Sequence, residues 1–259
     1  MKNMKDMKKT VMYTLNAENA TLHLSKANTK IGKILNFSTL PGNAEFKLRS
    51  KIGTLLTNVV GTCGRNCKKC FHKCYARNSA LRYHNTVIQA WGENTLLLRN
   101  KKVWGMIEKY LNARRKLPDM FRINVSGEIE SVEELEQWTR LATIYPTIKF
   151  GIYTKNFDAV DAYLTKHHDT PSNFCINISQ WNHVADKFLA KWPTQCNIFE
   201  YDSTNEKDCD FSEEDKLRLA NIDHCPAVDS KGRHIEGVTC QGCGICYRKE
   251  GTHTAVYSH

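Results

Sequence analysis

The sequence lacks any long apolar run. No stretch approaches the roughly 18 consecutive apolar residues that indicate a membrane-spanning helix. The lysine-rich start of the chain also has no apolar core of the kind found in a secretory signal peptide. We therefore expect no membrane contact and a cytoplasmic location, where cysteine thiols stay reduced.

Internal repeats and low-complexity segments are absent too, and a complete set of internal disulfides is excluded because the 11 cysteines are odd in number. The 259 residues are enough to bury a large core without disulfide staples. In a long intracellular chain, this many cysteines more often indicates metal binding than a disulfide framework.

Negative charge is also scarce, since 27 Asp and Glu residues face 37 Lys and Arg residues and leave a net charge of +10. Such an excess favours anionic partners, among them nucleic acids, nucleotides and phosphorylated metabolites. The alternative is that the excess serves solubility alone. Thiolates at a metal site would also cancel part of the positive charge.

Alternating strand and helix patterns occupy most of the chain. β-Prone apolar runs predict strands at 55–60, 121–126, 148–154, 174–179 and 196–201, with 222–225 as a candidate sixth strand. Helical periodicity lies between them, including two helices that break near Asn100 and a helix that starts with a capping box formed by Ser131 and Glu134. This alternation indicates parallel strands in an α/β fold. We expect a partial or complete TIM-like (β/α) barrel, with a doubly wound sheet as the alternative.

Three segments are expected to divide the chain. Residues 1–54 would form a small N-terminal β layer that packs on the barrel, and residues 55–222 the barrel itself. Residues 223–259 would form a C-terminal cysteine-rich extension that binds metal.

Four cysteines within twelve positions, Cys63, Cys67, Cys70 and Cys74, form the first metal-site candidate. The first three have the spacing C-x3-C-x2-C, which suits an iron–sulfur cluster with one iron free of protein ligands. All four together would also satisfy a tetrahedral zinc ion.

A second group consists of Cys225, Cys240, Cys243 and Cys246. Four thiolates suit a fully ligated [4Fe–4S] cluster or a structural zinc, and the spacing does not separate the two. Two further cysteines, Cys175 and Cys196, lie in apolar strands and are predicted to be core residues.

Polar residues end or directly follow three of the predicted strands, at the ends where barrel enzymes carry their active sites. They are Ser126, Gly127 and Glu128, then Thr154 and Lys155, and then Ser179. A lone Gly-Glu pair is more often part of a plain loop, but together these side chains would make a polar ring at one end of the sheet.

The order of these motifs resembles the radical SAM superfamily, and more narrowly the phage gene product 88 family. The likeness rests on SKANTKIGKILNFSTLPG, the TC…CYA loop, RINVSGEIES, IYTK and the final CP…CxxCxxC, and it covers roughly residues 22–247.

The resemblance implies a [4Fe–4S] cluster that binds S-adenosylmethionine (SAM) and reduces it to methionine and a 5′-deoxyadenosyl radical. It also implies that Gly127 and Glu128 contact the methionine amino group. Thr154, Lys155 and Ser179 are candidates for the carboxylate and ribose of SAM. The C-terminal cysteines would hold an auxiliary cluster, and an electron donor such as flavodoxin or ferredoxin would supply the electron.

The sequence departs from the superfamily pattern at one position. An aromatic residue commonly precedes the third cysteine, but Lys69 precedes Cys70, and the Cys-Tyr-Ala of the family falls at Cys74. We assign Cys63, Cys67 and Cys70 as the ligands and keep Cys74 as the alternative third ligand.

The leading hypothesis is therefore a radical SAM enzyme that acts on an anionic substrate, with a nucleotide or nucleic acid as the candidate. The competing hypothesis is a zinc-stabilised protein that binds nucleic acid and has no catalytic activity.

Overall fold

The computed structural model describes most of the chain. The described residues are 15–26, 31–49, 56–64, 70, 74–181, 183–207, 209 and 211–257. The predicted ligand Cys67 lies outside them, as does most of the loop between Gly64 and Cys74.

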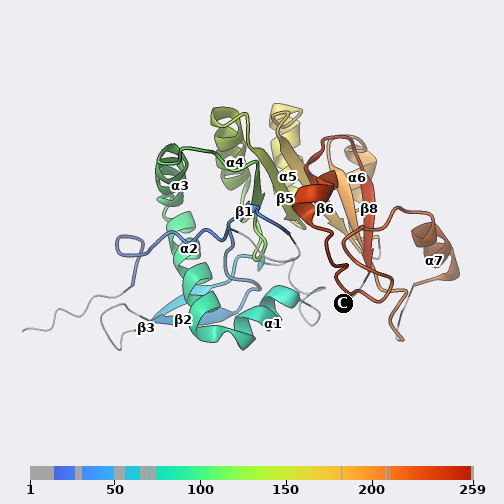
Figure 1. The fold of residues 1–259 in the computed structure, drawn as a ribbon, viewed down its shortest axis with the longest axis horizontal. Coiled ribbons are helices and arrows are strands. Elements are labelled where there is room, and N and C mark those ends of the chain that lie inside the picture. The colour runs from blue at the N-terminus through green and yellow to red at the C-terminus, as the bar shows by residue number, and fades with distance from the viewer. Residues whose placement is uncertain are drawn as a thin grey trace, which may run out of the picture.

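Six parallel strands form the main sheet, and their order in the sheet is their order in the chain (Figure 1). They are β1 (Leu35–Asn36), β4 (Met120–Ile123), β5 (Lys149–Thr154), β6 (Phe174–Gln180), β7 (Asn197–Asp202) and β8 (His253–Tyr257). Consecutive parallel neighbours require one crossover connection each, and such connections are right-handed, which places the crossover helices on one face. The predicted α/β class is confirmed.

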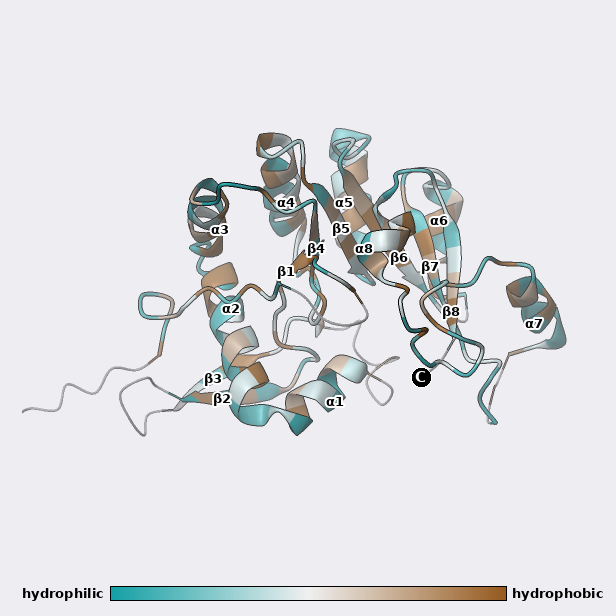
Figure 2. Cartoon of the chain, viewed as in Figure 1, coloured by the Kyte–Doolittle hydropathy of each residue, from teal (hydrophilic) through white to brown (hydrophobic). Residues whose placement is uncertain are grey.

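Helices α4 (Val132–Ile144), α5 (Phe157–His167) and α6 (Asp186–Lys191) follow β4, β5 and β6 and lie along one face of the sheet (Figure 1). Helix α7 (Glu213–Ala220) follows β7 and stands beyond the β8 edge. The short helix α8 (Cys240–Cys243) crosses the opposite face, followed by the 3-10 turn η3 (Ile245–Tyr247), which contacts β5 and β6 (Figure 2).

The sheet is open. Strand β1 forms one edge and β8 the other, and within the described residues these two strands do not pair. A complete barrel is therefore not formed by this part of the chain.

The predicted strand at 55–60 exists but is not part of the main sheet, so its assignment as the first barrel strand is wrong. It is β3 (Leu56–Val60), which pairs antiparallel with β2 (Glu45–Arg49) in a separate hairpin. The neighbour of β4 is instead the two-residue strand β1, which is too short to produce a period-2 pattern in the sequence.

The candidate sixth strand at 222–225 is also not a strand. His224 makes a single bridge to Ala255, and the Cys225 N–H donates to the Ala255 carbonyl at 2.7 Å. The sixth strand is β8, which comes from the end of the chain. The two flanking segments, 1–54 and 223–259, thus contribute one strand each to the main sheet.

Helices α1 (Tyr75–Arg82), η2 (His84–Ile88), α2 (Gln89–Arg99) and α3 (Val103–Asn112) connect the hairpin to the sheet. The break between α2 and α3 falls at Asn100, as predicted. The Ser131 hydroxyl accepts a hydrogen bond from the Glu134 N–H at the start of α4, which confirms one half of the predicted capping box. The Glu134 carboxylate accepts from the Glu130 N–H and not from that of Ser131, so the other half of the box is not formed.

The main core lies between the sheet and α4–α6. The rings of Phe121, Phe150 and Phe174 come from three neighbouring strands and stack in sequence, with Trp138 of α4 packed on Phe121. Figure 2 shows the apolar character of the central strands. Cys175 and Cys196 are buried, as predicted.

No helix in the described ranges is both long enough and apolar enough to cross a membrane.

Candidate functional site

The loop after β4 fixes the position of the Gly-Glu pair. Gly127 has a φ of +83°, and a Cβ at this residue would lie 1.9 Å from the Thr39 hydroxyl oxygen and 2.6 Å from that of Thr62. Only glycine satisfies both the backbone conformation and the space. The two threonine hydroxyls are themselves 2.9 Å apart, and the Glu128 N–H donates to Thr62 at 2.9 Å. The loop is therefore held against the residue that precedes Cys63.

The Glu128 carboxylate is buried and bonded to the end of the next strand. One oxygen accepts from the Ile129 N–H at 3.0 Å and the Thr154 hydroxyl at 2.6 Å, and the other accepts from the Lys155 N–H at 2.7 Å. Burial raises the pKa of Glu128, and the Lys155 charge and the Thr154 hydrogen bond offset part of that rise. A carboxylate has about four acceptor positions, so one position on the oxygen that bonds the Lys155 N–H has no donor among the described residues.

One member of the first cysteine group, Cys70, interacts electrostatically with Glu128 and Lys155. Burial raises the pKa of Cys70, the nearby Lys155 charge opposes that rise, and Cys74 and Glu128 add to it. Lys155, Cys74 and Glu128 are thus among the ionisable groups that act electrostatically on Cys70. The structure thus joins Glu128 to Thr154 and to the Lys155 N–H by hydrogen bonds, and the charges of Lys155 and Glu128 act on Cys70.

Two more contacts hold the ends of the cysteine loop. The Gly42 N–H donates to the Cys63 Sγ at 3.1 Å, a type of bond that stabilises negative charge on sulfur and tunes iron–sulfur clusters. Cys74 is the N-cap of α1, and its side chain makes no capping hydrogen bond. The next residue, Tyr75, donates from its hydroxyl to the Val125 carbonyl.

The second cysteine group lies on the sheet face opposite α4–α6. Cys240 and Cys246 pack with Ile31, Ile34 and Tyr247. Burial raises the pKa of Cys246 to about 11, and both Cys225 and Cys240 are close enough to contribute to that rise. All four predicted ligands are described, and their side chains do not converge as a metal-binding group in the described structure.

Within the described residues, no three His, Cys, Asp or Glu side chains converge as a metal-binding group. Cys67 is outside that set, so the first group is only partly covered. The chemistry of the donor set nonetheless fits an iron–sulfur cluster, because the group supplies thiols at the required spacing and the Cys63 sulfur already accepts an N–H bond.

Two predicted residues stand apart from the central contacts. The Ser126 hydroxyl is buried and has no hydrogen-bond partner in the described structure. Ser179 lies in β6, and no hydrogen bond of the described residues joins it to Glu128, Thr154 or Lys155.

The sequence reasoning missed Thr62, Arg122 and Asn124. Arg122 lies on β4 with its guanidinium 4.5 Å from the centre of the Tyr153 ring. Burial lowers the pKa of Arg122, but the neighbouring groups, led by Tyr153 and Tyr75, outweigh it and raise that pKa overall. The only available signal was that Arg122 and Asn124 belong to the same RINVSGEIES segment as the Gly-Glu pair.

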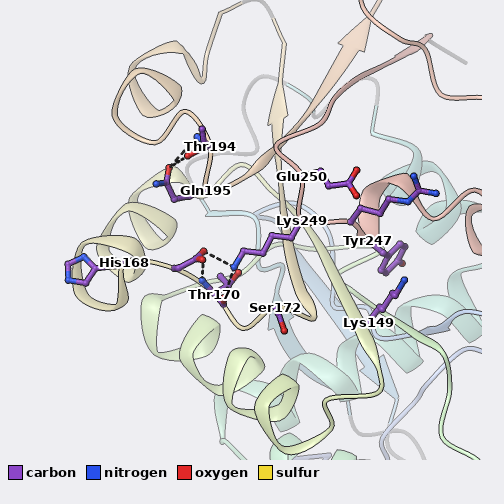
Figure 3. Close-up of a pocket in the computed structure, with 11 residues that line it drawn as sticks. Lys149, His168, Thr170, Ser172, Thr194, Gln195, Tyr247, Lys249 and Glu250 are labelled. Atoms are coloured by element: carbon purple, nitrogen blue, oxygen red, sulfur yellow. Dashed lines mark hydrogen bonds and ion pairs between the residues drawn. The ribbon is translucent and has the colours of Figure 1, made fainter.

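A separate hollow of about 790 Å³ opens at the other end of the strands (Figure 3). Lys149 begins β5, and Ser172 and Gln195 precede β6 and β7, so these residues mark the amino ends of the strands. Lys249 crosses the hollow and bonds to Asp169 and the Thr170 carbonyl (Figure 3). Ligands of parallel sheets bind at the carboxyl ends of the strands, so this hollow is not the candidate site.

Comparison with known proteins returned one family. No curated protein and no solved structure matches the chain. The family model described as "Gene product 88" matches residues 14–249, a range that holds both cysteine groups and the Gly-Glu loop. The chain therefore belongs to the gene product 88 family.

Proposed function

We propose that the protein is a radical SAM enzyme that acts on an anionic substrate. One observation carries the proposal: Thr62, the residue before Cys63, accepts a hydrogen bond from the Glu128 N–H at 2.9 Å, and the Glu128 carboxylate accepts from the Thr154 hydroxyl and the Lys155 N–H. The cysteine loop therefore belongs to the same site as the carboxyl ends of two parallel strands. The cysteine spacing in this loop is the one that leaves one iron of a cluster without a protein ligand. A zinc-stabilised loop would have no need of a buried glutamate and a lysine at that position.

Cys63, Cys67 and Cys70, with Cys74 as the alternative third residue, would hold the cluster. When bound, a [4Fe–4S] cluster with one open iron would coordinate SAM and supply the electron that cleaves it to methionine and a 5′-deoxyadenosyl radical. The electron itself would come from a reduced flavodoxin or ferredoxin.

The side chains at the strand ends would bind and orient SAM. The open acceptor position on Glu128 suits the methionine ammonium group, because the other acceptor positions are already used by Ile129, Thr154 and Lys155. The Lys155 ammonium would attract the methionine carboxylate. Ser126 and Ser179 are the remaining candidates for the ribose.

The open sheet is compatible with this chemistry. Consecutive parallel strands with helices on one face are the arrangement of an opened (β/α) barrel. The second cysteine group lies on the face that an opened barrel turns inward, where an auxiliary iron–sulfur cluster or a zinc ion would adjoin the substrate.

The test is anaerobic purification followed by iron and sulfide analysis, visible spectroscopy and a SAM cleavage assay. We expect brown protein that bleaches with dithionite and releases 5′-deoxyadenosine. A variant with alanine at Cys63, Cys67 and Cys70 should lose the cleavage activity. Cys209→Ala is the control, because Cys209 lies outside both cysteine groups.

Colourless protein that contains only zinc and releases no 5′-deoxyadenosine would overturn the proposal. That result would favour the non-catalytic nucleic-acid-binding protein, which the net charge of +10 also fits. Binding that weakens steeply with added salt would then support the nucleic-acid assignment.

A further inference from the structure

Buried polar atoms without partners are concentrated in one part of the fold. Seven buried side-chain nitrogen and oxygen atoms have no hydrogen-bond partner in the described structure, and five of them belong to Arg122, Asn124, Ser126 and Tyr247. Native proteins pair the large majority of such atoms. Three of these four residues lie at alternate positions along the segment that leads from β4 to Glu128.

Arg122 is the charged member of this set. In the part of the chain that the structure describes, no Asp or Glu side chain forms an ion pair with it. Its Nε is covered and unbonded, while the residue as a whole keeps part of its surface open. By contrast, Arg218 of α7 forms a two-bond pair with the buried Glu200 of β7 at 2.7 and 2.8 Å.

A cation in this environment requires an anion. Burying a charge without a partner is costly, and the described groups that act on Arg122 are tyrosines, led by Tyr153, and Cys240, none of which is a carboxylate. The planar guanidinium presents donors in a fork that matches the oxygens of a phosphate or a carboxylate.

Asn124 lies two residues further along the same segment. The residue is 4% exposed, and neither its amide nitrogen nor its amide oxygen has a hydrogen-bond partner among the described residues. It also has a φ of +50°, a conformation that asparagine and aspartate adopt more readily than other residues with side chains. The carboxamide offers both a donor and an acceptor to a group held by Arg122.

We propose that Arg122 and Asn124 form an oxyanion subsite that binds a phosphate or carboxylate group of the substrate. The subsite lies on the sheet face between the Gly-Glu loop and the second cysteine group. The identification of the bound molecule as the substrate rests on the proposed function. The anion binding itself does not, because it needs no cluster.

The experiment is calorimetric titration of the full chain, as purified, with inorganic pyrophosphate and separately with malonate at constant ionic strength. We expect saturable binding of at least one of the two, and the tighter one identifies phosphate or carboxylate as the natural group. Arg122→Gln should weaken that binding at least tenfold. Arg114→Gln is the matched control, because Arg114 also stacks on a tyrosine ring, 5.2 Å from the centre of Tyr110, but is exposed.

Asn124→Asp separates a binding role from a structural one. Aspartate has nearly the same shape and tolerates the positive φ, but its charge would occupy Arg122 and repel the anion. We expect anion binding to fall at least tenfold while the thermal midpoint stays level or rises.

Three results would overturn the subsite. They are the absence of saturable binding of either anion to the wild type, undiminished binding by Arg122→Gln, and displacement of the bound anion by SAM, which would assign Arg122 to the cofactor. A protein that binds the anion but fails to cleave SAM would instead refute the proposed function alone.

Discussion

The hydroxyl of Thr62 accepts a hydrogen bond from the backbone N–H of Glu128 at 2.9 Å. These residues are 66 positions apart, and each adjoins a functional motif, since Thr62 precedes Cys63 and Glu128 follows Gly127. The bond therefore sets the cysteine loop and the Gly-Glu loop in a fixed relation. A cofactor shared by both loops would need such a relation, because ligands must be held to within a fraction of an ångström.

Replacing Thr62 with valine should destabilise the protein by about 1–3 kcal/mol, because the buried Glu128 N–H loses its acceptor while the shape of the side chain is kept. The measurement is urea denaturation of the full chain. Thr62→Ser retains the hydroxyl and should lose much less stability. Equal stability of the valine variant and the wild type would show that the bond contributes nothing.

Replacing Gly127 with alanine should cost roughly 2–5 kcal/mol, since the new Cβ would lie 1.9 Å from the Thr39 hydroxyl oxygen at a φ of +83°. Thermal unfolding measures the loss. Gly105→Ala provides the contrast: this glycine lies inside α3, and a Cβ added there would have no described atom within 4 Å, so alanine should stabilise the helix by about 0.5–1 kcal/mol. A Gly127→Ala protein as stable as the wild type would contradict the described loop.

Single alanine variants at Cys70 and Cys74 should separate the third cluster ligand from its neighbour. We expect iron per chain to fall in Cys70→Ala and to remain in Cys74→Ala, measured on anaerobically purified protein. Serine variants at the same positions control for packing. Loss of iron only at Cys74 would show that the Cys-Tyr-Ala position supplies the ligand and that our assignment is wrong.

Glu134 should make stability depend on pH. Burial raises its pKa to about 8, and the hydrogen bonds from the Glu130 N–H and the Trp138 indole only partly oppose this rise. The folded state therefore holds a proton that the unfolded state releases near its ordinary pKa of 4.5. The contribution of Glu134 to the free energy of unfolding is fully present below that pKa. It falls as the pH rises toward about 8 and is constant at higher pH.

The expected fall is up to a few kcal/mol, since one pKa unit corresponds to about 1.4 kcal/mol. Glu134→Gln should flatten this part of the curve, as measured by urea denaturation at pH values from about 5 to 8. Glu133→Gln should leave the fall unchanged, because the Ser131 hydrogen bond lowers the pKa of Glu133 and moves its titration below this range. An equally steep fall in the Glu134 variant would assign the effect to other groups.

Local spacing in the sequence determined much of this protein. The alternation of apolar runs with helical periodicity predicted β4–β7 and α4–α7, and the Ser131 cap and the break at Asn100 were correct because both depend on residues within one helical turn. Apolar context also predicted that Cys175 and Cys196 are buried. The motifs after β4 and β5 were expected at one end of the sheet, because parallel strands bring their carboxyl ends together.

Only the tertiary structure decided which strands are neighbours. Leu56–Val60 pairs with a hairpin partner, and the two edges of the main sheet are β1 and β8, because strand pairing depends on contacts between distant segments that no local pattern records. The same holds for the bond between Thr62 and Glu128 and for Arg122, whose lack of an acidic partner among the described residues is a property of its surroundings and not of its spacing.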